Sequence, residues 1–131
     1  MAATQVELVA PSRTLYSGEA EMVVCRTEGG EIAFLADHMP YLGTLEPCLV
    51  RVVQESGDEL RAAVHGGFVE VRDNRVIMLA NVAELADEID VERARRAQSE
   101  AEDRVTSAGA DEDAEAAAAL RRAEVRIEVA G

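Results

Sequence analysis

Short runs of aliphatic residues, cut by turn residues, fill the chain from residue 4 to residue 80. In TQVELVA (4–10) aliphatic side chains alternate with polar ones, which is typical of a strand buried on one face. Other runs are aliphatic on both faces and turn signals recur about every 8–12 residues, so we expect two antiparallel sheets packed face to face. The predicted strands cover residues 4–10, 19–28, 31–36, 48–54, 59–65, 67–72 and 75–80.

After the last predicted strand the composition changes, and alanine, glutamate and arginine replace the β-branched residues. Asp90 is placed to cap a helix that runs to about Val105, and Asp111 is placed to cap a second helix after a glycine-containing break. Two helices joined by such a short turn form an antiparallel hairpin. The predicted fold class is therefore mainly β plus α, with an antiparallel β-sandwich over residues 1–86 and a two-helix hairpin over residues 87–131.

The faces that the two helices turn toward each other consist mostly of alanine, as at Ala94 and Ala101 in the first helix. Alanine buries little apolar surface, and each Å² contributes only about 25 cal/mol, so the hairpin should be held weakly to itself and to the sandwich. Weakly held elements are the ones that move. The sequence therefore predicts that the hairpin is a regulatory appendage able to detach.

The charge of the chain limits the classes of partner that it can bind. It carries 26 acidic residues against 13 basic ones, a net charge of -13, and all the basic residues are arginines. Nucleic-acid binders need clustered positive charge, so DNA and RNA are not expected partners. The absence of lysine excludes a Walker phosphate loop, a Schiff-base enzyme and a protein kinase. Neither a bilayer-spanning run nor a signal peptide is visible, so we expect a soluble, cytosolic protein with no direct membrane insertion.

Candidate catalytic and metal-binding groups are few. Cys25 and Cys48 have neither C-x-x-C spacing nor a nearby histidine pair, so we interpret them as buried or half-buried free thiols. The chain contains no G-x-S-x-G and no H-E-x-x-H motif. We therefore expect a protein that is not an enzyme, binds no metal and requires no cofactor.

Three arginines, Arg93, Arg95 and Arg96, follow Asp90 at the start of the first predicted helix. Cations at a helix N-terminus oppose the positive end of the helix dipole. Either something anionic meets these arginines, or they belong to a solvated face. In the second case the i,i+4 pairs Glu92–Arg96, Arg96–Glu100 and Glu100–Arg104 would satisfy the charges.

Two long segments resemble the epsilon subunit of bacterial F-type ATP synthase. GGEIAFLADHMPYLGTLEPCLVRV (29–52) is similar to the family pattern G-E-x-G-x-L-P-x-H-x-P-x-x-x-x-L-x-P-G, and AVHGGFVEVRDNRVIMLANVAELADEID (63–90) is similar to its S-G-G-F-V-E-V…I-D segment. The resemblance extends in order over essentially the whole chain. Residues matching the first pattern are Gly30, Glu31, Leu35, His38, Pro40, Leu45 and Pro47.

The chain departs from the family pattern at four positions. Ala33 and Cys48 replace glycines, Ala36 replaces a proline and His65 replaces a serine. Each change removes a residue suited to a turn, so loop conformations there should differ, at modest cost where φ is negative. The fold assignment does not depend on these positions, but the contacts of the 36–48 loop do.

The resemblance implies a non-catalytic rotor-stalk subunit of the proton-translocating ATP synthase, at the cytoplasmic face of the plasma membrane. One sheet face of the sandwich would bind the gamma subunit, the end of the sandwich would meet the polar loops of the c-ring, and the hairpin would move relative to the alpha/beta hexamer and inhibit ATP hydrolysis. Glu31 and His38 fall in the loop that the family places near gamma and the c-ring. The favoured interpretation of His38 is nevertheless a turn histidine bonded to nearby backbone, and His65 is interpreted as a strand-end residue.

Nucleotide-binding members of the family begin the first helix with I/L-D-x-x-R-A, which matches Ile89, Asp90, Arg93 and Ala94. Folding the hairpin about a turn near Ala108 brings Arg122 and Arg126 toward Arg93. Three guanidiniums in one place favour a phosphate, so ATP is a possible regulatory ligand. The alternatives remain a solvated charged face for the arginines and, for the whole chain, a free-standing acidic β-sandwich adaptor or chaperone-like module.

Overall fold

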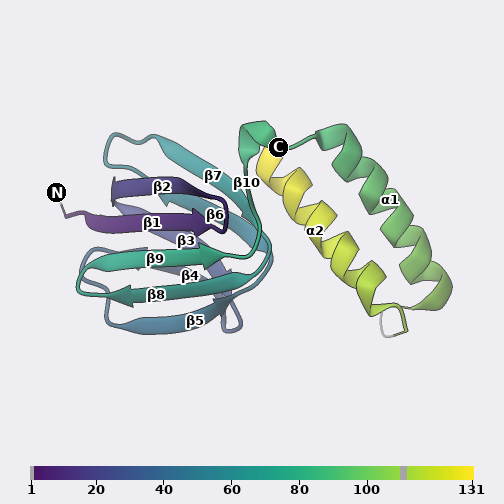
Figure 1. The fold of residues 1–131 in the computed structure, drawn as a ribbon, viewed down its shortest axis with the longest axis horizontal. Coiled ribbons are helices and arrows are strands. Elements are labelled where there is room, and N and C mark those ends of the chain that lie inside the picture. Colours follow the sequence, from purple (N-terminus) through teal and green to yellow (C-terminus); the bar gives the residue numbers. More distant parts are fainter. Residues whose placement is uncertain (1, 110–111) are drawn as a thin grey trace.

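The computed structural model describes residues 2–109 and 112–131 and shows a two-layer β structure followed by two helices (Figure 1). This confirms the predicted fold class. The strands are β1 (Thr4–Ala10), β2 (Arg13–Ala20), β3 (Met22–Thr27), β4 (Gly30–Leu35), β5 (Tyr41–Leu45), β6 (Cys48–Val53), β7 (Glu59–Val64), β8 (Gly67–Arg72), β9 (Arg75–Ala80) and β10 (Ala83–Leu85).

The strands form one sheet that folds over into two layers, in the order β10-β7-β6-β3-β5-β8-β9-β1-β2, with β4 paired to β3. The two layers are joined where β3 pairs with β5. This pairing consists of the single residue pair Thr27–Leu45. In Figure 1 strands β1, β9 and β8 lie in front of β3 and β4. Strand pairs are antiparallel as expected, except that β1 runs parallel to β9.

The core between the layers consists of the aliphatic residues that the alternation predicted. Along β1 every second side chain is buried, and Val6 and Leu8 are fully enclosed. Phe34 and Met78 are also fully buried, and no tryptophan contributes to this core. Burial of such side chains is worth about 1.5–3 kcal/mol each, so the sandwich has its own hydrophobic core without the helices.

Strands β2, β5 and β10 were not predicted from the sequence. Strand β2 is polar and half-exposed because it lies at an edge and pairs only with β1. In β5, the buried Gly43 makes room for the ring of Tyr41, since a Cβ there would lie 2.7 Å from that ring. Strand β10 is only three residues long, which gives no periodicity to detect.

The double glycine after β7 is a backbone requirement. Gly67 has a φ of 136°, and a Cβ on it would collide with the backbone oxygen of Leu79 on the neighbouring strand. By contrast, none of the four substituted positions Ala33, Ala36, Cys48 and His65 has a positive φ. The backbone therefore tolerates these departures from the family pattern.

The hairpin consists of α1 (Val91–Ala108) and α2 (Ala114–Ala130), which follow a short 3-10 turn, η1 (Ala86–Glu88). Asp90 caps α1 as predicted, by accepting a hydrogen bond from the backbone N–H of Arg93. Helix α1 runs three residues beyond the predicted end at Val105. The predicted cap Asp111 lies outside the described residues, and Asp113 caps α2 in the structure.

Alanines line the seam between the helices: the buried residues of α1 are Ala94 and Ala101, and Ala116 and Ala123 are buried on α2. The rest of the buried face of α2 contacts the sandwich instead. Val125 and Val129 pack with Ala63 of β7 and with Ile89, at the end of the connecting turn. The hairpin therefore meets the sandwich along α2, next to β6 and β7.

Candidate functional site

The hairpin and the sandwich enclose a cavity of about 280 Å³ at their junction. The β10–η1 segment forms one wall, and the first turns of α1 and the last turns of α2 form the others. Four of the six residues predicted to bind nucleotide meet here. Its lining residues are Glu84, Glu88, Asp90, Arg93, Ala94, Ala97 and Arg126.

The two other predicted nucleotide-binding residues do not line the cavity. Ile89 is buried beneath it, in the cluster with Val125 and Val129, where it anchors the start of the hairpin to the sandwich. Arg122 points its guanidinium at Glu115 on its own helix, at 2.9 Å. The arrangement in the structure thus brings two of the three expected arginines together.

Helix capping fixes the α1 side of the cavity. The carboxylate of Asp90 accepts from the backbone N–H of Arg93 at 3.1 Å, which holds the first turn in place. The Arg93 side chain is exposed, and among the described residues its guanidinium has no ion-pair partner. An exposed guanidinium at the mouth of a cavity is available to an anionic ligand.

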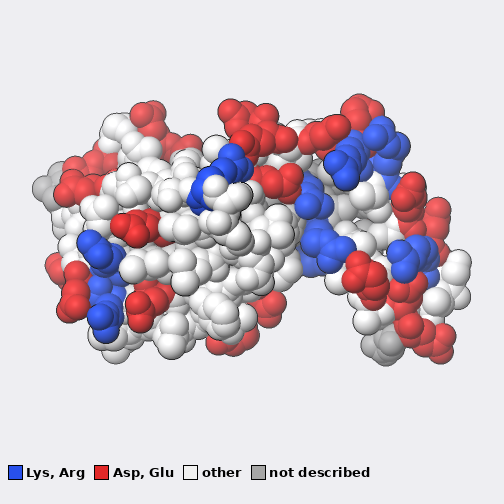
Figure 2. Space-filling model, in the orientation of Figure 1, with Lys and Arg blue, Asp and Glu red and all other residues white. Residues whose placement is uncertain are grey.

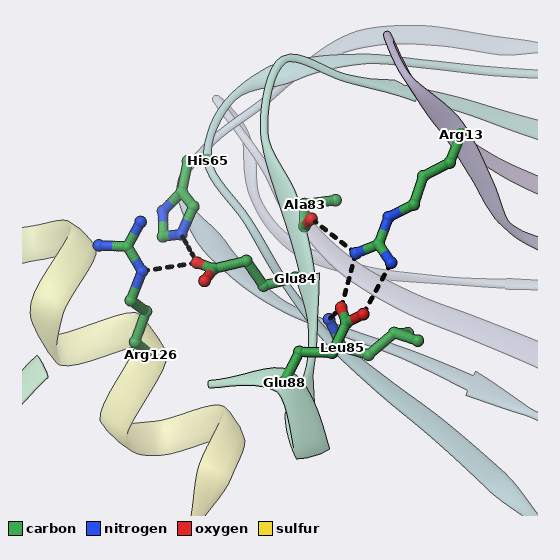
Figure 3. A network of polar contacts seen from close by, with 7 residues as sticks. All are labelled: Arg13, His65, Ala83, Glu84, Leu85, Glu88 and Arg126. Atoms are coloured by element: carbon green, nitrogen blue, oxygen red, sulfur yellow. Dashed lines mark hydrogen bonds and ion pairs between the residues drawn. The ribbon is translucent and has the colours of Figure 1, made fainter. Parts of the chain in front are cut away.

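On the α2 side, Arg126 is already paired. Its Nε donates to Oε1 of Glu84 on β10 at 2.6 Å, so a side chain of the hairpin bonds directly to the sandwich (Figure 3). The pair is half-buried, with side-chain exposures of 29% and 31%. Partial burial limits competition from water and makes this contact stronger than a surface ion pair.

Three carboxylates and two guanidiniums line the cavity, so its electrostatics are mixed. A ligand with only negative groups would meet the carboxylates of Glu84, Glu88 and Asp90 as well as the arginines. A nucleotide offers both kinds of group, because its phosphates accept from guanidinium and its ribose hydroxyls and base amine donate to carboxylate. The lining of the cavity thus contains both hydrogen-bond donors and acceptors.

A second polar contact ties the η1 turn to the sandwich. The guanidinium of Arg13, at the start of β2, donates to both oxygens of Glu88, at 2.7 and 2.6 Å (Figure 3). The same carboxylate accepts from the backbone N–H of Leu85 at 2.9 Å. The bonds from Arg13 and Leu85 hold the pKa of Glu88 down at about 2. This wall of the cavity is therefore fixed from the sandwich side.

His65 is the residue of the junction whose role the sequence analysis missed. It lies between β7 and β8 as a strand-end residue, but its side chain is buried and lies 3.5 Å from Oε1 of Glu84. Burial and the nearby Arg126 lower its pKa. The departure from the family's serine at this position was the signal that could have indicated it.

The arginines on the outside of α1 do not form the helical ion pairs that the sequence suggested. Arg95 and Arg96 are exposed, and none of the three predicted i,i+4 pairs is an ion pair within the described part of the chain. Arg104 bonds to Asp113 across the hairpin turn instead, at 3.0 Å. The expected pairs are therefore not formed. For Glu100–Arg104 the reason is that Asp113, the cap of α2, binds Arg104 instead.

Glu31 and His38 lie on the sandwich, away from the cavity. Glu31 is exposed in β4, and His38 follows that strand in the loop before β5. The ring of His38 stands edge-on to Phe34, with centroids 4.9 Å apart, and its Nδ1 is 2.7 Å from the backbone oxygen of Met39. The interpretation of His38 as a turn histidine bonded to nearby backbone is confirmed.

The outer face of β5, β8 and β9 exposes three large apolar side chains, beside Thr44 and Glu70. Phe68 lies opposite Leu79 in the β8–β9 register, and Leu42 lies on the same face in β5. Their exposed fractions are 72% for Leu42, 57% for Phe68 and 53% for Leu79. Figure 2 shows a largely uncharged area on this side of the sandwich, with acidic side chains also present on the face and further charged side chains along its left edge. Contiguous exposed apolar surface of this kind indicates a protein-binding face.

The cysteines, possible metal ligands and helix hydrophobicity were the remaining features of interest. Both cysteines are free and buried, as predicted, and burial raises the pKa of Cys25 to about 12. Over residues 2–109 and 112–131, no three histidine, cysteine, aspartate or glutamate side chains are grouped closely enough to hold a metal ion. Neither helix, as far as it is described, has the length and apolar character to cross a membrane.

The fold and the junction define a class of protein: a β-sandwich with an exposed apolar face and a docked helical hairpin. Residues 3–86 match the family model of the ATP synthase delta/epsilon chain β-sandwich domain, and residues 87–131 match the model of its long α-helix domain. The chain therefore belongs to the ATP synthase delta/epsilon chain family, as the sequence resemblance indicated.

Relatives and solved structures agree with this assignment. The chain is 49% identical over 129 residues to the ATP synthase epsilon chain of Thermobifida fusca, covering 95% of this chain and 90% of the relative. It is 48% identical over 122 residues to the epsilon chain of Streptomyces griseus, covering 93% and 90%. A chain of the Euglena gracilis mitochondrial ATP synthase (OSCP/F1/c-ring) superposes with a TM-score of 0.86 at 26% identity, covering 99% of this chain and 82% of that one.

Proposed function

We propose that this chain is the epsilon subunit of a proton-translocating F-type ATP synthase, a non-catalytic component of the central stalk. Support comes from relatives named as epsilon chains and from the likeness to a chain of an assembled F1/c-ring complex. In this role it is a peripheral subunit at the cytoplasmic face of the plasma membrane. It couples the rotor to the c-ring and regulates ATP hydrolysis through the hairpin.

The observation that carries this proposal is the apolar face of β5, β8 and β9. An isolated soluble protein rarely exposes contiguous apolar side chains of the size of Leu42, Phe68 and Leu79, and a stalk subunit must bury a sheet face against its neighbour. We assign this face to the gamma subunit. Glu31 lies on strand β4 and not in a loop as expected, whereas His38 lies in the loop after that strand. We assign both residues to contacts with gamma and the polar loops of the c-ring.

Co-purification with gamma tests the proposal. Phe68→Glu places a charge on the apolar face and should abolish a stoichiometric complex with gamma, while the circular dichroism spectrum stays unchanged because the side chain is exposed. Thr14→Glu places the same charge on the exposed edge strand β2 and should leave the complex intact. If unmodified protein fails to bind gamma, the chain is a free-standing binding module instead.

A second function, ATP sensing, is favoured by the cavity at the junction. In the docked form, Arg93 and Arg126 would hold phosphate groups, Asp90 would fix the helix start, and the carboxylates would accept from the ribose or base. Bound ATP would stabilise the docked hairpin against an extended form that reaches the alpha/beta hexamer and obstructs rotation. The ligand acts only through its preference for one form over the other.

Calorimetry with ATP tests this second function. Arg93→Ala should remove one charge-assisted contact, worth about 1.5–3 kcal/mol, and lower the ATP affinity by about 10- to 150-fold. Arg95→Ala removes an exposed arginine on the same helix that does not line the cavity, and should leave the affinity unchanged. If millimolar ATP gives no heat with the unmodified chain, the arginines are a solvated face, while the assignment as a stalk subunit stands.

A further inference from the structure

His65 occupies an unusual position at the junction. Its side chain is 4% exposed, and within the described structure neither ring nitrogen has a hydrogen-bond partner. A buried imidazole without a partner is costly, because its nitrogens have lost their bonds to water. An unsatisfied group at a moving junction invites a functional explanation.

The neighbours of His65 supply one. Its Nε2 is 3.5 Å from Oε1 of Glu84, the same oxygen that accepts the 2.6 Å hydrogen bond from Arg126. In Figure 3 the histidine and the arginine approach the carboxylate from the sandwich and from α2, respectively. A neutral imidazole leaves Glu84 to Arg126. A protonated imidazole would be a second cation competing for the same oxygen.

The charged groups around His65 come from two elements. Glu84 lies on β10, which belongs to the sandwich and stays with His65 when the hairpin moves. Arg126 and Arg122 lie on α2 and leave with it; both disfavour a charge on the imidazole, as does burial. The docked hairpin therefore opposes protonation of His65, whereas the undocked form leaves His65 facing Glu84 alone.

We propose that His65 is a proton sensor for the hairpin: protonation of its imidazole draws Glu84 away from Arg126 and releases α2 from the sandwich. The proton comes from solvent and binds the free ring nitrogen, and no covalent bond is broken. Loss of the Glu84–Arg126 hydrogen bond weakens the junction, and undocking then also gives up the bonds from Arg61 and Arg121 to backbone oxygens. The device acts within the isolated chain. It operates whether or not the cavity binds ATP or the sandwich binds gamma.

The sign of the effect follows from linkage. The pKa of His65 is lower in the docked form than its ordinary value of 6.5, so the undocked form binds more protons. Docking is therefore fully favoured above the pKa of the undocked form and is lost as the pH falls below it. With the ordinary pKa of 6.5 as the reference for the undocked form, one linked proton lowers the docking equilibrium constant by at most about tenfold between pH 8 and pH 5.5.

Distance measurements by pulsed electron paramagnetic resonance test the proposal on the full chain. Spin labels at Ser56→Cys, in the exposed β6–β7 loop, and Ser107→Cys, at the exposed end of α1, report docked and undocked populations. The chain with His65 intact should give an undocked-to-docked ratio that rises from pH 8 to pH 5.5, by at most about tenfold. The response should disappear in His65→Gln and persist in His38→Gln, which removes the other histidine of the chain.

An NMR titration of the histidines in the unlabelled chain tests the proposal without any substitution at position 65. Arg126→Gln takes away a cation that disfavours the charged imidazole, so the measured pKa of His65 should rise. The proposal is overturned if the docked fraction is constant over this pH range, or if His65→Gln keeps the full response. It is equally overturned if His65 titrates in the unmodified chain without a matching change in docking.

Discussion

Two valines should account for most of the apolar hold of the hairpin on the sandwich. Val125 and Val129 are each 1% exposed and are the α2 side chains buried against Ala63 and Ile89. Replacing a buried valine by alanine removes the equivalent of about two methylene groups, worth about 1.5 kcal/mol of transfer free energy. We expect Val125→Ala and Val129→Ala each to lower the docking equilibrium constant about tenfold, with a larger, not fully additive effect together.

The substitution acts on docking and not on the helix. Alanine has a higher helix propensity than valine by several tenths of a kcal/mol, so α2 should remain helical when it leaves the sandwich. The core between the sheet layers does not include these valines, so thermal unfolding of the sandwich should change little. Loss of docking with unchanged helix content and sandwich stability is thus the specific signature of the junction.

The pulsed resonance experiment at pH 8, in the absence of ATP, measures the docked fraction directly. Val105→Ala makes the same chemical change on α1, outside the docking cluster, and serves as the control. An unchanged docked fraction in the double variant would refute the reasoning, because the polar contacts alone would then hold the hairpin. A fall in sandwich stability equal to the loss of docking would also refute it, since the two parts would share one core.

Three further outcomes follow from the structure. A chain ending at Ala86 should remain a folded β protein that binds gamma, as circular dichroism and co-purification can show, because its core lacks helix residues. Cys25 and Cys48 should react with a thiol reagent at pH 8 only after unfolding, since both are buried and burial raises both pKa values. Bonds from Arg13 hold the pKa of Glu88 at about 2 in the folded chain. The ionised carboxylate therefore stabilises the fold above its unfolded pKa, and this stabilisation is lost as the pH falls toward 2. Glu88→Gln should make the free energy of unfolding depend less on pH in this acid range.

Most of the fold could be predicted from the sequence because the pattern of hydrophobic and polar residues indicates the strands and their buried faces. Alternation in 4–10 identified Val6 and Leu8 as core residues, and both are fully buried. Asp90 was identified as a helix cap because aspartate, directly before an alanine-rich segment, can accept a hydrogen bond from the first turn of a helix. Patterns of this kind depend on residues close together in the chain, which a sequence displays directly.

The parts that were not predicted depend on contacts that form only in the folded chain. Strand β2 is polar because its edge position leaves it half in water, and only its pairing with β1 makes it a strand. Arg104 finds Asp113 instead of Glu100 because the hairpin turn brings that carboxylate closer. His65 reads as an ordinary strand-end residue until the fold places Glu84 and Arg126 beside it.

The junction holds the hairpin with small apolar side chains and with polar contacts that water can replace. Besides the Arg126–Glu84 pair, Arg61 donates to the backbone oxygens of Glu128 and Val129 at the end of α2, and Arg121 donates to that of Pro47. Each such contact adds little net free energy, because undocking exchanges it for bonds to water. A ligand at a hundredfold excess over its Kd supplies about 2.7 kcal/mol. For the regulatory role proposed above, that is comparable with the loss of two buried valines, so a ligand at the cavity would shift the docking equilibrium by as much as these apolar contacts contribute to it.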